Sequence, residues 1–201
     1  MNATDCAAIV LAAGLSSRMG SLKPLLPLGE GTIADHVIAT FAANNVEVYL
    51  VVGYRKKEIA ASIKDRSVNI VENPQYEQGM FTSVQAGVRR LRRSHKRFFV
   101  MPVDIPLVSP ATVGQLMTEA RSHPRSILYP TFGGRRGHPV LIPARLVEPI
   151  LQWKKDGGLK ALLSADMDFA EVPVRDSNVV FDVDGPDDFT ELLGRLQRSP
   201  S

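Results

Sequence analysis

IVLAAGLSSRMGSLKPLLPL, residues 9–28, starts as an unbroken apolar run and then changes to glycine, serine and two cations. The apolar run Ala7–Ala13 does not alternate with polar residues, which predicts a strand buried on both faces. Arg18 and Lys23 follow it in a loop with no acidic residue, and the loop's glycines expose backbone N–H groups. This combination suits a phosphate group; the alternative is a solvated turn with two incidental charges.

Strand-type and helix-type segments alternate along the rest of the chain. The further strands are expected at 46–53, 68–73, 97–104, 126–132 and 138–143. The helices are expected at 32–44, 55–64 and 82–93, with another beginning at Pro110. This order predicts an α/β class: a single-domain, Rossmann-like three-layer fold over residues 1–201 with a mostly parallel sheet. Thr32 and Asp35 resemble a capping box at the first helix.

The amino-acid composition indicates a globular protein with one domain and excludes some kinds of site. The chain has 201 residues, 44% hydrophobic and 22% charged, with a net charge of +3, which favours one globular domain and small anionic ligands. Cys6 is the only cysteine, which excludes an intrachain disulfide and a zinc site built from several cysteines. No signal peptide or membrane span is recognisable, so we expect a cytoplasmic protein. The basic run Arg89–Arg97 lacks interleaved aromatic residues, which favours a solvated face over a nucleic-acid site.

Polar residues follow the expected strands, where ligands bind in open α/β sheets. Asp104 ends an apolar strand between two prolines, which indicates a magnesium ligand or, alternatively, an Asx turn or helix cap. The segment VVFDVDGPDDF places Asp182 and Asp184 on one side of an extended stretch, ahead of two acids that suit a helix N-terminus. His138 begins a later strand, where a lone histidine is often structural.

The first loop closely resembles the L-A-x-G-x-S-x-R-M-G-x-x-K signature of the molybdenum cofactor nucleotidyltransferases, which belong to a wider superfamily with a nucleotide-diphospho-sugar transferase type of fold. The resemblance implies that Arg18 and Lys23 hold a nucleoside triphosphate. It also implies base and ribose contacts from four consecutive residues: Leu11, Ala12, Ala13 and Gly14.

Three other segments support the resemblance. NPQYEQGMFTS, residues 73–83, is similar to a nucleobase-binding segment of the cytidylyl branch, which implies contacts from Gly79 and Ser83 and a weaker one from Asn73. On its own this segment is equally consistent with a simple helix entry, in which Thr82 or Ser83 caps the helix.

The other two segments concern the metal and the acceptor. The resemblance implies that Asp104 and Asp184 bind Mg²⁺ or Mn²⁺, although Gly185 stands where the family usually has Thr. GHPVLI implies that His138 faces the acceptor phosphate without acting as a general base. Arg18, Lys23 and Asp104 are then the expected catalytic residues.

The expected reaction is transfer of CMP from CTP to the phosphate of molybdopterin, with an apo molybdenum hydroxylase as a partner. LAAG, NPQYEQGM and GHPVLI favour the cytidylyl branch, whereas PVDIP around Asp104 is closer to the guanylyl pattern. The alternatives are a guanylyltransferase, another NTP-dependent nucleotidyltransferase that acts on a sugar phosphate or alcohol phosphate, a non-catalytic carrier or chaperone of the molybdenum cofactor, and a redox enzyme. The absence of G-x-G-x-x-G counts against the last of these.

Overall fold

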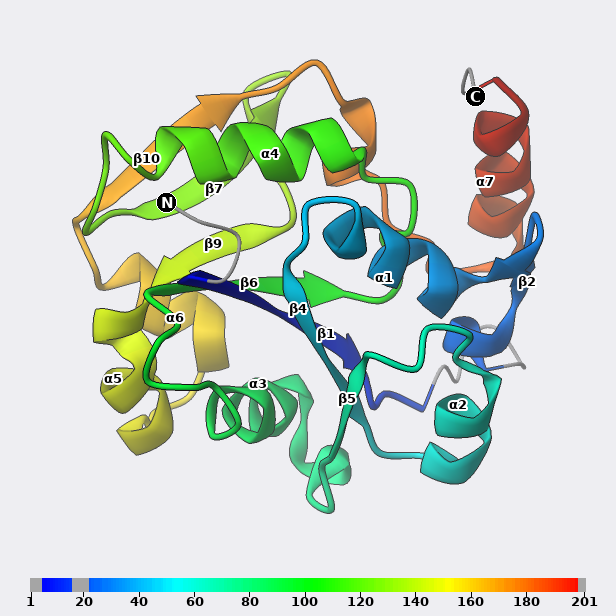
Figure 1. The fold of residues 1–201 in the computed structure, drawn as a ribbon, viewed down its shortest axis with the longest axis horizontal. Helices are drawn as coiled ribbons and strands as arrows, with labels where there is room; N and C mark the ends of the chain where they lie inside the picture. The colour runs from blue at the N-terminus through cyan, green and yellow to red at the C-terminus, as the bar shows by residue number, and fades with distance from the viewer. Residues whose placement is uncertain (1–4, 16–21, 199–201) are drawn as a thin grey trace.

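The computed structural model describes residues 5–15 and 22–198 and is built on one large twisted sheet (Figure 1). The strands of the sheet are β1 (Cys6–Ala12), β4 (Glu47–Val52), β5 (Asn69–Glu72), β6 (Arg97–Pro102), β7 (Ile127–Phe132), β8 (Arg135–Arg136), β9 (Val140–Pro143) and β10 (Phe169–Pro173). Their order is β10-β7-β9-β6-β1-β4-β5, and β8 pairs with β7. A separate small hairpin joins β2 (Pro27–Leu28) to β3 (Gly31–Thr32).

Helices cover both faces of the sheet, as the alternation of segments predicts. One face carries α1 (Ile33–Ala42), α2 (Lys56–Ser62), α4 (Pro110–Glu119) and α7 (Pro186–Arg198). The other carries α3 (Met80–Val88), α5 (Val147–Gln152) and α6 (Gly158–Ser164). The predicted α/β class and three-layer arrangement are therefore confirmed. None of the helices in the described ranges is long and apolar enough to cross a membrane.

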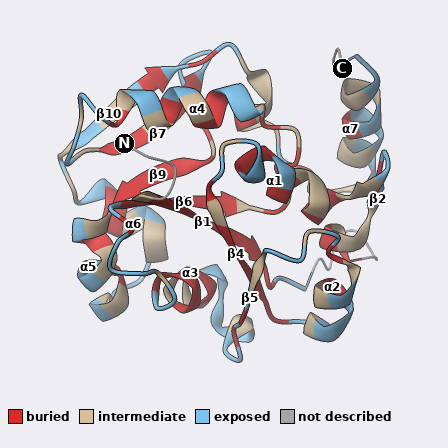
Figure 2. Ribbon diagram, viewed as in Figure 1, coloured by how far each residue is buried: buried red, intermediate tan, exposed pale blue. Residues whose placement is uncertain are grey.

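The first strand lies at the centre of the molecule and is buried along its whole length (Figure 2). It pairs in parallel with β4 on one side and β6 on the other. Ala8 and Val10 belong to the core under α1 and α4, while Ala7 and Ile9 belong to the core under α3. Successive side chains of a strand point to opposite faces, so an apolar run without alternation is what a strand between two helical layers requires.

The sheet is mostly parallel, with an exception at β9. This strand runs antiparallel to both β6 and β7. The chain leaves β7 through Gly133 and Gly134, whose φ angles are +57° and +75°, and turns straight back through β8. A glycine pair permits this left-handed turn, and the return path is too short for a crossover helix. β7 therefore runs in the same direction as β6, and both end at the same edge of the sheet.

The start of α1 agrees with the capping box predicted from the sequence, whereas the start of α3 differs from the prediction. Thr32 and Asp35 form the expected capping box of α1. The helix expected at 82–93 instead spans Met80–Val88, so Thr82 and Ser83 lie inside it and the predicted side-chain cap is wrong. Gly79 occupies the N-cap position with φ +103°, a conformation that glycine adopts without strain.

Candidate functional site

Three segments that are distant in the sequence meet beyond the carboxyl ends of β1 and β6. The Nζ atom of Lys23 lies 3.0 Å from Oδ1 of Asp184 and 3.7 Å from Oδ2 of Asp104. Lys23 opens a 3₁₀ turn that is anchored by the buried Pro24. The sequence prediction that this lysine and these two acids belong to one site is therefore consistent with the geometry.

Backbone hydrogen bonds hold the two acids in place. Asp104 accepts at its carbonyl from the N–H of Val183, at 2.8 Å, which ties the end of β6 to the segment before α7. Asp188 accepts from the N–H groups of Asp184 and Gly185, at 2.9 and 2.8 Å. Asp188 thus serves the helix N-terminus, as expected from the sequence, and leaves the Asp184 carboxylate directed at Lys23.

The electrostatics of this site favour a bound cation. Burial raises the pKa of Asp104 above its ordinary value of 3.8; Lys23 opposes this shift, and Asp182 and Asp184 add to it. Within the described residues no group of three or more His, Cys, Asp or Glu side chains could hold a metal alone. Two carboxylates that converge on one positive charge fit Mg²⁺ or Mn²⁺, which take their remaining ligands from phosphate and water.

The first loop continues directly from the core. Leu11, Ala12 and Ala13 are buried, whereas Gly14 is exposed and has no neighbouring atom within 4 Å of where a Cβ would lie. Among residues 5–15 and 22–198, no atom therefore covers the side of Gly14 on which a Cβ would lie. Arg18 lies outside the described residues, as do its neighbours from 16 to 21.

The second loop is braced internally. The Asn73 amide donates to the hydroxyls of Thr82 and Ser83, both at 2.9 Å, and its oxygen accepts from the N–H of Gln75 at 3.0 Å. Asn73 and Ser83 are both buried, at 2% and 3% exposure. These side chains set the shape of the loop, while Gly79 is exposed at its tip with no neighbour close to a Cβ position.

A cleft of about 730 Å³ lies next to the lysine and acids. Leu11, Asp104 and His138 are the sequence-predicted residues that line it. The remaining described candidates lie outside its lining: Ala12, Ala13, Gly14, Lys23, Asn73, Gly79, Ser83 and Asp184. The candidates therefore form two groups. The loop side comprises the residues outside the cleft lining, and the cleft side comprises Leu11, Asp104 and His138. Leu11 and Asp104 lie where the two groups meet.

His138 is half-buried at the start of β9. Its backbone N–H donates to the carbonyl of Val179 at 2.8 Å, and a Cβ on the preceding Gly137 would lie 2.2 Å from that same oxygen. Only glycine permits this close approach. The Nδ1 atom of His138 is buried and has no hydrogen-bond partner within the described part of the chain. Burial lowers the pKa of His138 below its ordinary value of 6.5, so the imidazole is neutral at pH 7.

The cleft also contains residues to which the sequence reasoning gave no site role. Tyr129 comes from the middle of β7, and Leu159 and Lys160 come from the first turn of α6. The double glycine Gly157–Gly158 ahead of an apolar run was the available signal for α6. It could not have indicated that the helix packs beside α3, where a Cβ on Gly158 would lie 3.2 Å from Cβ of Phe81.

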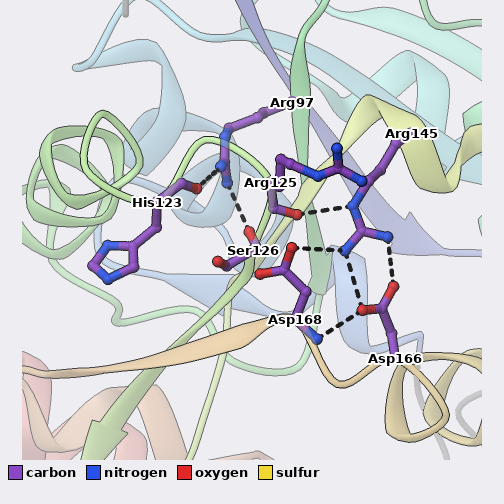
Figure 3. Close-up of polar contacts among 7 residues, drawn as sticks. All are labelled: Arg97, His123, Arg125, Ser126, Arg145, Asp166 and Asp168. Carbon is purple, nitrogen blue, oxygen red and sulfur yellow. Dashed lines mark hydrogen bonds and ion pairs between the residues drawn. The ribbon is translucent and has the colours of Figure 1, made fainter.

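A second cluster of charges lies at the opposite edge of the sheet (Figure 3). Arg145 makes two hydrogen bonds to Asp166, at 2.6 and 3.1 Å, and lies 3.7 Å from Asp168. Arg97 is 2% exposed and donates to the backbone carbonyls of Ser126 and His123. Arg97, Arg145 and Asp166 are all bonded to other parts of the chain, so we interpret this cluster as structural.

A lysine beside two acids beyond the carboxyl ends of parallel strands is typical of an α/β enzyme that acts on nucleotides. The sequence comparison gives the family: residues 8–171 match the MobA-like NTP transferase domain, and the chain belongs to this family. It is thus an enzyme of the nucleotidyltransferase type.

The chain is also similar to individual proteins of known name or structure. Molybdenum cofactor cytidylyltransferase of Escherichia coli K12 is 33% identical over 94% of this chain and 95% of its own length. Nicotine blue oxidoreductase of Paenarthrobacter nicotinovorans is 31% identical over 69% of this chain and 71% of its own length. The fold matches Rv0371c of Mycobacterium tuberculosis H37Rv, solved in complex with manganese, at a TM-score of 0.78 and 22% identity, over 94% of this chain and 97% of the other.

Proposed function

We propose that this enzyme transfers CMP from CTP to the phosphate of molybdopterin, the organic part of the molybdenum cofactor, and releases pyrophosphate. The observation that carries the proposal is the convergence of Lys23, Asp104 and Asp184 at the mouth of a cleft large enough for a second substrate. The cytidylyltransferase from E. coli, which aligns over almost the whole chain, supports the choice of reaction.

The loop side of the site would bind the nucleotide. The open backbone at Gly14 and Gly79 suits contacts to ribose and base, with Leu11, Ala12 and Ala13 forming the floor. Asn73 and Ser83 would affect base binding indirectly. Their side chains form a hydrogen bond with each other, and this bond holds the second loop in shape. Lys23, together with Arg18, would stabilise the negative charge that develops on the leaving pyrophosphate.

Asp104 and Asp184 are the residues that would hold a divalent metal. Such an ion, when bound, neutralises phosphate charge and polarises the phosphorus that is attacked. The manganese complex of the structurally similar M. tuberculosis protein supports this choice of ligand. Lys23, which lies between the acids, would move toward the phosphates as the nucleotide binds.

The cleft side would position the acceptor. A phosphate monoester is already an anion at neutral pH, so the attack on the α-phosphorus needs no general base. A neutral His138 is consistent with this, because it can contact the acceptor without adding or removing a proton. The chain's contribution is to align two anions and lower their repulsion, which is catalysis by positioning and electrostatics.

CTP is favoured over GTP by the sequence segments LAAG, NPQYEQGM and GHPVLI, while PVDIP around Asp104 resembles the guanylyl pattern. The test is magnesium-dependent pyrophosphate release by the purified protein with molybdopterin and each of CTP, GTP, ATP and UTP. Faster release with CTP supports the proposal, and faster release with GTP moves the enzyme to the guanylyl branch. Asp104→Asn is the inactive control, and no release with any nucleotide would refute the reaction.

A redox activity is the second candidate, because a relative of this chain bears the name of an oxidoreductase. Oxidation of NADH or NADPH in the presence of nicotine blue, the compound in that relative's name, would support it. The proposed transferase predicts no nicotinamide oxidation, and in the cell a cytoplasmic apo molybdenum hydroxylase would receive the product.

A further inference from the structure

Gly53 lies between the two loops that we propose to bind the nucleotide. It follows β4, and β4 is placed in the sheet between β1, which leads into the first loop, and β5, which leads into the second. Main-chain hydrogen bonds join this position to both loops. The N–H of Tyr54 donates to the carbonyl of Ala13 at 3.4 Å, and the N–H of Asn73 donates to the carbonyl of Val52 at 2.8 Å.

The space around Gly53, and not its backbone conformation, requires a glycine. The φ angle of Gly53 lies outside the left-handed region, so other residues could adopt the same conformation. Gly53 is buried, and a Cβ added to it would lie 2.6 Å from Cβ of Tyr76 and 3.0 Å from Cβ of Ala13. Ala13 belongs to the first loop and Tyr76 to the second, so the absent side chain lets the two loops approach each other.

A larger residue than glycine could not be accommodated by rotation of a side chain. The atom of Tyr76 nearest to the added Cβ is its own Cβ, whose position is set by the main chain. The Tyr76 ring also packs beside the ring of Tyr54, with 6.4 Å between their centroids. Carbon atoms that are not bonded to each other pack at about 3.5–4.0 Å, so the second loop would have to move by about 1 Å.

The residues around Gly53 are directly connected to the exposed glycines of the two loops. Ala13 precedes Gly14, and the carbonyl of Tyr76 accepts from the N–H of Gly79 at 3.3 Å. Gly14 and Gly79 are the positions to which we assign contacts with ribose and base. A change in the distance between Ala13 and Tyr76 would therefore change the distance between these contacts.

We propose that Gly53 is a positioning residue for the nucleotide: because it has no side chain, the two loops come close enough to hold one nucleotide between them. This inference rests on the proposed function, since it takes the two loops as the nucleotide site. A side chain at position 53 would hold the loops apart and weaken nucleotide binding without contacting the nucleotide.

The first test compares nucleotide affinity with stability. For Gly53→Ala we expect the Kd for CTP or GTP with Mg²⁺, measured by calorimetry, to rise about tenfold, because a displacement of about 1 Å in a site has effects of this size or larger. Gly114→Ala is the matched control: a Cβ on Gly114 would lie 3.1 Å from Oδ1 of Asn44, and Gly114 belongs to α4, outside both loops. Its Kd values stay at the wild-type level. The free energy of unfolding in urea, measured for each variant, shows that folded proteins are compared.

The second test asks whether the effect depends on the Cβ atom of Tyr76. Tyr76→Gly removes this atom, whereas Tyr76→Ala keeps it and removes only the ring. Added to Tyr76→Ala, Gly53→Ala should again raise the Kd about tenfold. Added to Tyr76→Gly, it should raise the Kd less than threefold, because only the contact of 3.0 Å with Ala13 remains. Each double variant is compared with its own Tyr76 variant, so the loss of the ring cancels.

An unchanged Kd in Gly53→Ala, or an equal effect of this substitution in both Tyr76 variants, would overturn the inference. A merely structural role would lower the free energy of unfolding and leave the Kd of the folded protein unchanged. If wild type binds GTP more tightly than CTP, or releases no pyrophosphate with molybdopterin, the proposed function fails and the nucleotide that binds still decides the inference. Binding of neither nucleotide by wild type would overturn both.

Discussion

The two ends of β6 hold buried charge in opposite ways. At its start, Arg97 is satisfied by two backbone carbonyls, and the neighbouring Arg145 is matched by Asp166 (Figure 3). Just past its end, Asp104 shares one lysine with Asp184 and is repelled by Asp182 and Asp184. In the first cluster the hydrogen bonds of Arg97 and the Arg145–Asp166 pair lie within the chain, whereas in the second, counted over residues 5–15 and 22–198, three acids lie around one lysine.

This difference separates stability from function. Removing a group from the matched cluster leaves its buried partners without a hydrogen bond, which lowers the free energy of unfolding. Removing an acid from the second cluster relieves repulsion in the metal-free protein but takes away a proposed metal ligand. The predictions below test whether substitutions at the two edges have these opposite consequences.

The largest effect is expected for Asp104→Asn. Because Asp104 is a proposed metal ligand at the reacting phosphates, its loss lowers the rate of pyrophosphate release about 10³-fold. The free energy of unfolding, measured in urea without metal, stays level or rises, because burial and two nearby acids already disfavour this carboxylate. If the variant were active and its free energy of unfolding were much lower, Asp104 would stabilise the fold, as Arg97 does, and would not be a metal ligand.

Lys23→Met is expected to change two properties in opposite directions. Turnover falls about 10²-fold, the effect of losing one cation that acts in the transition state. Affinity for Mn²⁺ without nucleotide rises about tenfold, because the ammonium group no longer competes for Asp104 and Asp184. Lys56→Met provides the control, since Lys56 pairs with Glu72 on the surface and leaves both properties at the wild-type level. Unchanged turnover in Lys23→Met would remove this residue from the mechanism.

Arg97→Met should affect stability alone. It leaves the carbonyls of His123 and Ser126 buried without their donor and lowers the free energy of unfolding by about 2 kcal/mol, measured in urea. The kcat of the folded variant remains within twofold of wild type. A loss of turnover larger than the loss of folded protein would contradict the assignment of this edge to structure.

The smallest effect concerns acid stability. The hydrogen bonds from Arg145 hold the pKa of Asp166 below its ordinary value of 3.8. The folded state therefore keeps Asp166 ionised where the unfolded chain takes up a proton, so the stabilisation is present above pH 3.8 and is lost as the pH falls through the lower folded-state value. The melting temperature of Arg145→Met should fall less steeply than that of wild type below pH 4; parallel curves would show that the pair does not couple folding to pH.

The part of the molecule proposed to bind the nucleotide, around β1 and the end of β6, could be predicted closely from the sequence. Ala7–Ala13 indicated a central strand because an apolar run without alternation needs cover on both faces, and Asp104 was recognisable because it ends such a strand. The convergence of Lys23, Asp104 and Asp184 followed from the family motifs, since composition and periodicity contain no information on contacts between residues 161 positions apart.

The part of the molecule proposed to bind the acceptor, which includes β9 and α6, could be predicted only in outline. The direction of β9 depends on the tight turn at Gly133–Gly134, and a short apolar run reads the same in either direction. The place of Lys160 in the cleft lining could not be predicted, because an exposed lysine on a seven-residue helix has no local pattern that separates a cleft residue from any other surface residue. Asn73 and Ser83 were expected to touch the base, and only the coordinates show that they bond to each other.

The most direct test of the central claim is the effect of magnesium on nucleotide affinity, measured by calorimetry in wild type and in Asp104→Asn/Asp184→Asn. The nucleotide is whichever of the four triphosphates wild type binds most tightly. The account predicts that Mg²⁺ tightens binding at least tenfold in wild type and by less than twofold in the double variant. A double variant that keeps the full magnesium effect would show that these two acids do not hold the metal.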